Sequence, residues 1–263
     1  MGIKTIIKGI LPIRLKRAIG VFLHPNLLPS SNKKSNSNYP EFPYFHDGLA
    51  TMHKHDFMTD ERFINAFSEA EKFLLAPKMY WRTYIICWAA SKGVCLEGDF
   101  VECGVFKGGF AKAVISYTQF EKLNKTYFLF DTFNGLSKDH SSDKEKTREF
   151  AYYRYQEDYF EEASNNFINY DNVKLVKGIV PESLQKVEIS KVAFLSLDMN
   201  SAIPEEHALN YFWDKLSSGA VIVFDDYGFN GYEEQKIVHD EFALSKNLQV
   251  LLLPTGQGLL FKP

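Results

Sequence analysis

The chain has 263 residues, of which 45% are hydrophobic and 24% charged, with 16 glycines and 10 prolines. These proportions exclude collagen-like, mucin-like and wholly disordered proteins, and the length suits one large α/β domain. The net charge is −3, yet residues 1–38 hold seven Lys or Arg and no acid, so the rest of the chain carries −10. Nucleic-acid binding needs a basic surface, so the acidic body argues against it.

The three cysteines (Cys87, Cys95 and Cys103) show no Cys-x-x-Cys spacing. A disulfide scaffold or a structural zinc site is therefore not expected, and a reducing cytoplasmic setting fits better. The chain contains no run of 18 apolar residues, so we also expect no membrane-spanning helix.

The first 23 residues alternate cations with apolar side chains, and Arg14, Lys16 and Arg17 interrupt the apolar run that a secretory signal would need. A basic amphipathic segment can lie on an anionic membrane surface, so peripheral membrane contact through residues 1–23 is one interpretation. The alternative is a flexible arm, or a helix packed on a partner subunit of a homo-oligomer. We divide the chain into a basic arm with a polar linker (1–38), an N-terminal helical extension or lid (39–95) and a core domain (96–263).

Apolar residues at spacings of three and four predict a helix that Asp60 can cap, and a second helix over 80–91. Beyond them, apolar runs of strand length alternate with helical stretches, which is typical of an α/β fold with a parallel sheet covered on both faces. The expected strands are Phe100–Cys103, Thr126–Phe130, Val173–Val176, Val192–Leu197 and Ala220–Phe224. The expected helices are Gly109–Leu123, Tyr152–Ile168, Pro204–Lys215 and Tyr232–Ser245. The last two strands, Leu248–Leu253 and Gly258–Lys262, have no helix between them and therefore form an antiparallel pair.

A glycine-rich turn follows the first expected strand of the core and runs from Gly98 to Gly109. In α/β sheets ligands bind beyond the carboxyl ends of the strands, where such a turn lets the backbone approach them closely. The spacing is E-x-G-x-x-x-G-G rather than the dinucleotide fingerprint G-x-G-x-x-G, and an acid at Glu102 suits a cationic ligand group better than a pyrophosphate. The alternative is a helix N-terminus that needs glycine only for packing.

The second strand of the core ends in F-D-T-F. Asp131 lies 23 residues after Gly108, at a place where an acid can bind ribose hydroxyls. Phe133 can cover an adenine face, or it can simply pack in the core. Together with the glycine turn, the acid favours a ligand that contains a nucleoside.

Three more acids close the fourth and fifth strands: Asp198 in L-D-M-N, and Asp225 and Asp226 in F-D-D-Y. Neighbouring strands of a parallel sheet lie about 4.8 Å apart and end at the same edge, so these side chains are expected to lie close together. Two like charges about 4 Å apart repel by about 4 kcal/mol at an effective dielectric constant of about 20, so the cluster must hold protons or a cation. Carboxylate oxygens suit Mg²⁺, and less well Ca²⁺ or Mn²⁺. The alternative is that individual aspartates cap the helices that follow.

Five motifs occur in order between Thr51 and Lys262: E-C-G-V-F-K-G-G, F-D-T-F-N-G-L, K-G-I-V-P-E-S-L, L-D-M-N and F-D-D-Y-G. Together they resemble the macrocin/mycinamicin type of S-adenosylmethionine-dependent sugar O-methyltransferase. The resemblance implies the class I methyltransferase fold, a Rossmann-like sheet of seven strands with a C-terminal antiparallel hairpin. The N-terminal helical extension precedes it.

The same resemblance implies roles for the residues at matching positions. It assigns the methionine part of the cofactor to Glu102, Gly104, Val105, Phe106, Lys107 and Gly108. It assigns the ribose to Asp131, the adenine to Thr132, Phe133, Gly178 and Ile179, and a covering segment to Thr51 and Met52. It assigns Mg²⁺ to Asp198, Asp225 and Asp226. Macrolide-modifying relatives usually carry an acid at the position of Asn200, so this neutral side chain bears on the identity of the acceptor.

These roles imply a Mg²⁺-dependent transfer of the sulfonium methyl to one hydroxyl of a vicinal diol. The acceptor would be a sugar or glycan in polysaccharide, glycolipid or secondary-metabolite biosynthesis. The candidate catalytic residues are Asp198 and, as a general base in a polar loop, His140. Other histidines that could cover the sheet edge are His46, His53 and His55. We expect His207 and His239 to lie on helices away from the chemistry.

Two other functions stay open on the sequence alone. A nicotinamide-dependent sugar oxidoreductase or epimerase would share the sheet; its G-x-G-x-x-G is missing, but Tyr211 and Lys215 give a Tyr-x-x-x-Lys spacing on a helix. A non-catalytic, membrane-associated assembly protein could keep a degenerate methyltransferase-like fold, although the residues at the strand ends are intact.

Overall fold

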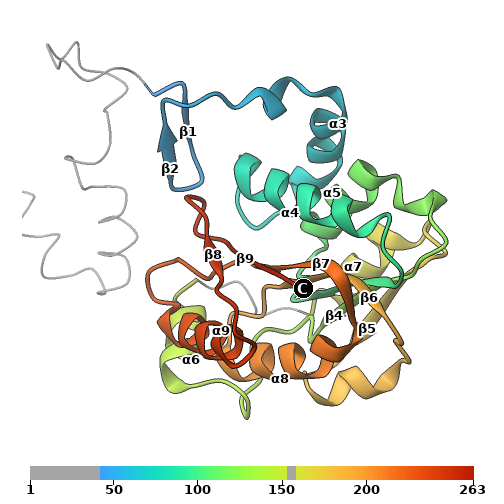
Figure 1. Ribbon diagram of the computed structural model, residues 1–263, viewed down its shortest axis with the longest axis vertical. Coiled ribbons are helices and arrows are strands. Elements are labelled where there is room, and N and C mark those ends of the chain that lie inside the picture. The colour runs from blue at the N-terminus through green and yellow to red at the C-terminus, as the bar shows by residue number, and fades with distance from the viewer. Residues whose placement is uncertain (1–41, 153–157) are drawn as a thin grey trace, which may run out of the picture. The chain divides into compact units, whose positions relative to one another are not determined.

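Seven strands form the central sheet of the computed structural model, which describes residues 42–152 and 158–263 (Figure 1). In the order in which they lie side by side, the strands are β5 (Val173–Lys177), β4 (Tyr127–Asp131), β3 (Asp99–Cys103), β6 (Val192–Leu197), β7 (Leu216–Phe224), β9 (Gly258–Phe261) and β8 (Leu251–Leu252). Neighbouring strands from β5 to β7 are parallel, and β9 is inserted antiparallel between β7 and β8. The class I methyltransferase sheet with its C-terminal antiparallel hairpin is therefore confirmed.

The compact unit runs from Tyr44 to Pro263. The expectations for residues 1–38 lie outside the described residues, as does part of the helix expected over Tyr152–Ile168. In the described ranges, no helix combines the length and the apolar character that crossing a bilayer requires.

The inner strands are apolar on both faces because helices cover both faces of the sheet. All six residues of β6 are buried. Side chains alternate along the strands, so that Phe100 and Phe194 face one layer of helices while their neighbours Val101 and Leu195 face the other. The first layer contains α3 (Glu61–Ala70), α4 (Tyr80–Gly93), α5 (Gly109–Thr118) and α7 (Phe160–Phe167), and the second contains α8 (Ala202–Phe212) and α9 (Glu233–Ser245).

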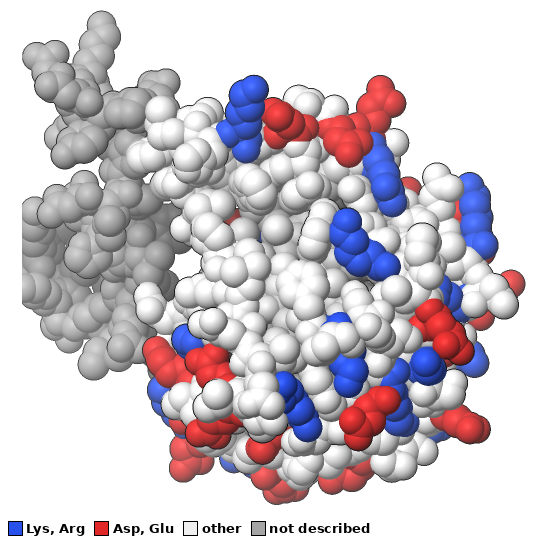
Figure 2. Space-filling model, in the orientation of Figure 1, with Lys and Arg blue, Asp and Glu red and all other residues white. Residues whose placement is uncertain are grey.

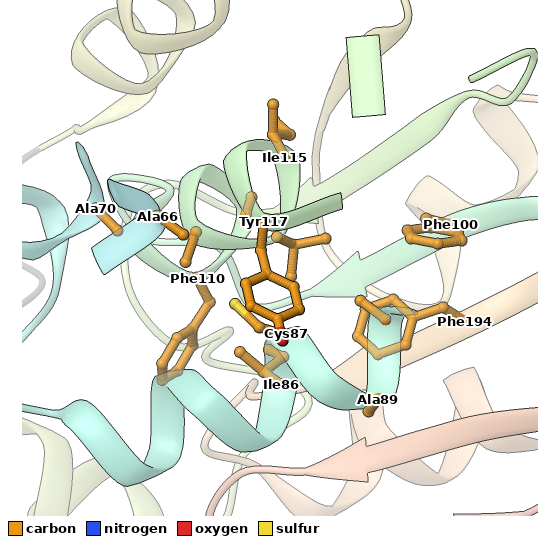
Figure 3. Packing of buried hydrophobic residues seen from close by; sticks show 14 of the residues in the cluster. Ala66, Ala70, Ile86, Cys87, Ala89, Phe100, Phe110, Ile115, Tyr117 and Phe194 are labelled. Atoms are coloured by element: carbon orange, nitrogen blue, oxygen red, sulfur yellow. The ribbon is translucent and has the colours of Figure 1, made fainter. Parts of the chain in front are cut away.

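Figure 3 shows the centre of the first layer. Helices α4 and α5 pack on each other through Ile86, Cys87, Phe110 and Tyr117, all of which are buried. Removing this much apolar surface from water stabilises the layer by about 1.5–3 kcal/mol for each large side chain. The packing fixes the position of α4 above the sheet, and α4 carries one charged residue, Arg82, toward the site described below.

Two helices end differently from the expectation. Helix α5 ends at Thr118 rather than Leu123 because Gln119 takes a left-handed φ of 53° and its N–H donates to Ile115 and Ser116 carbonyls. Helix α8 ends at Phe212, and its last expected residues form a short 3-10 turn, Trp213–Lys215.

A helix and a hairpin were not expected. Helix α6 (Asp143–Tyr152) is too polar to show an apolar period, and Glu145 holds it in place by accepting the N–H of Ala202 at 2.7 Å. A hairpin of β1 (Tyr44–His46) and β2 (Leu49–Thr51) lies in the 39–95 extension, which was expected to be helical. Its Asp47–Gly48 turn has φ values of 52° and 74°, the left-handed values that a two-residue type I′ turn requires.

Charge is distributed unevenly over the face shown in Figure 2. Acidic and basic side chains are interspersed along its lower edge, while its centre, over α4 and β9, carries few charges. On this face the described residues offer nucleic acid no continuous basic surface.

Candidate functional site

Two neighbouring cavities open where the carboxyl ends of β3, β4, β6 and β7 meet. The cavity beyond β4 has an empty volume of about 510 Å³ and is called the β4 cavity; its walls include Thr132, Ser137, Gly178 and Ile179. The other has an empty volume of about 940 Å³ and is called the α4 cavity; its walls include Phe73, Leu74, Leu75, Met79, Arg82, Phe229 and Tyr232. The two cavities share Gly104, Asp131, Asp198 and Asn200. A ligand that fills both must therefore pass these four residues.

The glycine turn after β3 needs its glycines for steric reasons. Gly104 has a φ of 92°, and a Cβ added to it would lie 2.0 Å from the carbonyl oxygen of Asp198. Gly108 has a φ of 90°, and a Cβ there would lie 2.4 Å from the Phe167 ring. Only glycine fits at these positions. Of the two, Gly104 lines both cavities, so the turn comes close to a ligand in either one there.

Asp131, at the end of β4, organises this turn. One carboxylate oxygen accepts the N–H groups of Val105 at 2.5 Å and Phe106 at 2.8 Å, and the other accepts the N–H of Phe133 at 2.7 Å. Burial raises the pKa of Asp131, and the backbone donors oppose this effect because they favour the charged form. Asp131 lines both cavities, as its expected contact with ribose requires. It also has a structural role that the sequence did not reveal.

Four residues assigned to the cofactor, Glu102, Lys107, Gly108 and Phe133, do not line either cavity among the described residues. Glu102 is 1% exposed and accepts the hydroxyl of Tyr127 at 2.7 Å, and burial raises its pKa to about 8. Lys107 pairs with Glu162 of α7, with 2.9 Å between Nζ and Oε2. The ring of Phe133 is 1% exposed and packs edge-on against Phe160, with 5.3 Å between ring centroids. Phe133 has a left-handed φ of 53°, and its ring packs in the core, as the core-packing alternative expected.

Thr51, Met52 and His140 also lie outside the described walls of the cavities. Thr51 belongs to β2 and accepts the N–H of His53, and Met52 is 51% exposed. The Nε2 of His140 lies 3.3 Å from Glu182, so its imidazole is engaged at the surface beside the β4 cavity. None of the described histidines lines either cavity, and the role of His140 as a general base stays a prediction.

The three strand-end aspartates converge. Asp198, Asp225 and Asp226 each offer a carboxylate oxygen within 4.8 Å of the others, and Asp198 and Asp226 line the α4 cavity. Burial and the negative charge of Asp226 raise the pKa of Asp198 well above its usual range. The helix-cap alternative fails for Asp198 and Asp225, because no cap hydrogen bond from their side chains is found among the described residues. The set of oxygen ligands fits Mg²⁺.

Arg82 is a site residue that the sequence analysis missed. Its guanidinium contacts both oxygens of Asp225, and it lies 3.9 Å from Asp226 and 3.7 Å from Asp47 in the turn of the β1–β2 hairpin. Gln257 also donates to Asp225, at 2.9 Å. The available signal was a single charge within the otherwise apolar start of α4, since a charge on a buried helix face needs a partner.

The pair expected for an oxidoreductase lies elsewhere. The ammonium of Lys215 sits over the ring of Tyr211, 3.9 Å from its centroid, and the Tyr211 hydroxyl donates to the Leu184 carbonyl at 3.1 Å. Neither residue is among the described walls of the cavities. The Tyr-x-x-x-Lys spacing therefore reflects a local contact beside α8.

Comparisons with known proteins agree with this geometry. The O-methyltransferase NovP is 20% identical over 69% of this chain and 79% of its own, with a TM-score of 0.59. CalS11, a calicheamicin methyltransferase, is 14% identical over 87% of this chain and 99% of its own, with a TM-score of 0.54. At these identities the likeness establishes the fold. No curated protein sequence matches significantly.

The structural likeness shows the fold, and a family model shows the family. Residues 88–252, more than half of the chain, match the model of the macrocin O-methyltransferase (TylF) family. The chain therefore belongs to the macrocin O-methyltransferase (TylF) family and is an S-adenosylmethionine-dependent O-methyltransferase.

Proposed function

We propose that this enzyme transfers the methyl group of S-adenosylmethionine to one hydroxyl of a vicinal diol in a sugar, with the help of Mg²⁺. The observation that carries the proposal is the convergence of Asp198, Asp225 and Asp226 within 4.8 Å, beside the wall that Asp198 gives to both cavities. A donor in one cavity and an acceptor in the other would meet at Asp198. CalS11, which shares the fold, is described as a TDP-rhamnose 3'-O-methyltransferase, and this supports a sugar acceptor.

The cofactor fits the β4 cavity and the glycine turn. We assign its adenine to the space beside Thr132, Gly178 and Ile179, and its ribose to Asp131. The methionine part would pass Gly104 and Val105 toward the α4 cavity, which both residues line. This places the sulfonium near Asp198, at the junction of the two cavities.

The acceptor fits the α4 cavity, which is the larger of the two. Its walls offer aromatic rings from Phe229 and Tyr232 and the amide of Asn230. Apolar walls with a few polar groups are typical of a site that orients a small ligand. The rings can cover the C–H face of a sugar, while Asn230 and Asn200 can bind hydroxyls.

Asp198, Asp225 and Asp226 would hold Mg²⁺, which when bound lowers the pKa of a chelated hydroxyl. The chain's own contribution is position: the cavities align the hydroxyl oxygen with the methyl carbon, so that the C–O bond forms as the S–C bond breaks. Asp198 lines both cavities and is placed to take the hydroxyl proton. It replaces His140 as our candidate for that role.

We place this reaction in the cytoplasm, in polysaccharide, glycolipid or secondary-metabolite biosynthesis. Peripheral membrane contact through residues 1–23 and a homo-oligomer stay as predictions from the sequence. Comparing full-length protein with a 1–38 deletion in liposome co-sedimentation tests the first of these.

The proposal is tested with labelled S-adenosylmethionine and a panel of nucleotide sugars and glycan extracts. EDTA should abolish label transfer and Mg²⁺ should restore it. Asp198→Asn should lose activity at least about a hundredfold, whereas the matched control Asp214→Asn, an exposed position in a 3-10 turn, should behave like the wild type. Full activity in chelator would refute the metal mechanism.

A further inference from the structure

A group of three fully buried polar side chains lies beneath the strand ends, and the proposed transfer does not use it. Glu205 comes from α8, and Gln235 and His239 come from one face of α9. Each of the three is 1% exposed, and none lines either cavity among the described residues. The sequence analysis placed His239 away from the chemistry.

Glu205 holds the turn that follows β6. Its Oε1 accepts the backbone N–H of Met199 at 2.9 Å and the side-chain amide of Gln235, also at 2.9 Å. Met199 stands between Asp198 and Asn200, and Asn200 has a left-handed φ of 57°. A non-glycine residue in this conformation persists only where its surroundings fix it. The bond from Met199 to Glu205 supplies such a restraint directly beside Asp198.

His239 joins the same carboxylate to the neighbouring strand. Its Nε2 lies 2.7 Å from the other oxygen of Glu205. Its ring stacks on Phe224, with 4.1 Å between ring centroids and 25° between ring planes. Phe224 is the last residue of β7 and directly precedes Asp225 and Asp226. One buried pair therefore contacts both strand ends that carry the three aspartates.

Stability alone gives a poor reason for this arrangement. Burying a carboxylate and an imidazole removes both from water, and well-packed apolar residues of similar volume usually stabilise a core as well or better. What the polar pair adds is a defined geometry: the hydrogen bond to Glu205 fixes where the Met199 amide lies, and the 2.7 Å contact with the other carboxylate oxygen fixes where the His239 ring lies.

We propose that Glu205 and His239 are positioning residues that set the spacing between Asp198 on β6 and the Asp225–Asp226 pair on β7. The inference rests on the proposed function, because that spacing matters for a divalent ion shared by the three carboxylates. Glu205 fixes the β6 side through Met199, and His239 ties Glu205 to the β7 side through Phe224.

The test compares variants that keep a polar partner at these two positions with variants that remove it. Glu205→Gln keeps an acceptor for Met199, and His239→Gln keeps a donor for Glu205, whereas Glu205→Leu and His239→Leu lose these groups. Ser217→Ala is the matched control, since it removes a buried hydrogen bond to the Glu97 carbonyl at the opposite end of β7. We would measure melting temperature, Mn²⁺ affinity by electron paramagnetic resonance, affinity for S-adenosylhomocysteine, and hydrogen exchange of the Met199 amide.

We expect the two leucine variants to bind Mn²⁺ at least about tenfold more weakly at temperatures where they are folded. The Met199 amide should lose its protection in Glu205→Leu and keep it in Glu205→Gln. Both glutamine variants and Ser217→Ala should bind Mn²⁺ like the wild type. Should one leucine variant fail to fold, the other decides on Mn²⁺ affinity, because each removes one of the two contacts; loss of Mn²⁺ affinity in a folded glutamine variant would also overturn the proposal.

Two further results would overturn the proposal. In one, the leucine variants lose melting temperature but bind Mn²⁺ as tightly as the wild type. In the other, the Met199 amide exchanges equally in Glu205→Leu and the wild type. If the wild type itself does not bind Mn²⁺, the metal part of the proposed function fails instead. The positioning role is then judged on affinity for S-adenosylhomocysteine, because Asp198 and Asn200 line both cavities; an unchanged affinity in Glu205→Leu would refute it.

Discussion

The buried carboxyl of Glu102 makes the stability of the fold depend on pH in a way that one substitution should remove. Burial raises the pKa of Glu102 from its ordinary 4.5 to about 8, while the hydrogen bond from Tyr127 opposes the shift. Below pH 4.5 the group is protonated in both the folded and the unfolded chain. As the pH rises from 4.5 to about 8, the unfolded chain releases this proton while the folded chain retains it. Stability is therefore lost across this window and levels off above about pH 8.

The magnitude follows from the size of the shift. A difference between 4.5 and about 8 corresponds to about 4–5 kcal/mol of unfolding free energy, since each tenfold change in proton affinity is worth about 1.4 kcal/mol. Glu102→Gln is the appropriate perturbation, because the glutamine oxygen can still accept the Tyr127 hydroxyl and no ionisation remains. We expect the variant to match the wild type at pH 4.5 and to exceed it by several kcal/mol at pH 8.

The assay is urea unfolding of both proteins at about pH 4.5, about pH 6 and about pH 8, which cover the range between the two pKa values of Glu102. Taking the difference between variant and wild type at each pH cancels the other titrating groups. Glu97→Gln is the control, since Glu97 is exposed and lies just before the same strand. Parallel stability curves for Glu102→Gln and the wild type would refute the reasoning, because they would mean that Glu102 ionises in the folded protein as it does in water.

Three further substitutions test the site. Asp131→Asn should weaken binding of S-adenosylhomocysteine at least about tenfold by calorimetry and lower the unfolding free energy by about 1–3 kcal/mol, because asparagine keeps one acceptor oxygen where the carboxylate uses two for backbone N–H donors. Unchanged affinity would contradict the assignment of the ribose. Phe133→Leu should lower the unfolding free energy by about 1–2 kcal/mol in thermal unfolding and leave the affinity for S-adenosylhomocysteine within about twofold of the wild type. A large loss of this affinity would instead support a contact of Phe133 with the adenine. Arg82→Gln should cost about 3–5 kcal/mol because it leaves Asp225 buried without its cation, and Mg²⁺ should raise the melting temperature of this variant more than that of the wild type or of the control Arg62→Gln. An equal response to Mg²⁺ would contradict the metal assignment.

The sheet could be predicted because parallel strands that are buried on both faces consist of consecutive apolar residues in the sequence. The run Val192–Leu197 coincides with β6. The meeting of Asp198, Asp225 and Asp226 could be predicted for the same reason, since the end of a run marks the end of a strand and parallel strands end at one edge. Both the sheet and the convergence of the three aspartates follow from the order and direction of the strands alone.

Side-chain direction could not be predicted. Phe133 stands two residues after a strand end, where a left-handed φ decides whether its ring faces the ligand or the core. Arg82 lies 143 positions from Asp225 in the sequence, and their contact depends on how α4 packs over the sheet. Helix α6 is polar and is held by single contacts such as that of Glu145 with Ala202. Such contacts produce no regular spacing of apolar residues from which a helix could be predicted. The hairpin is different, because Asp47–Gly48 between short apolar stretches is a turn signal that was present and was not used.

The two cavities divide the chain in a way that bears on specificity. Every residue that lines the described part of the β4 cavity lies within 88–252, the range that matches the family, whereas Phe73, Leu74, Leu75, Met79 and Arg82 of the α4 cavity precede it. Membership of the family thus bears directly on the cavity that we assign to the cofactor. The cavity that we assign to the acceptor is built partly from a segment outside the matched range, which contacts the acid cluster through Arg82. Since Asp198 and Asn200 line both halves, we infer that the core fixes the chemistry and the extension selects which hydroxyl reaches it.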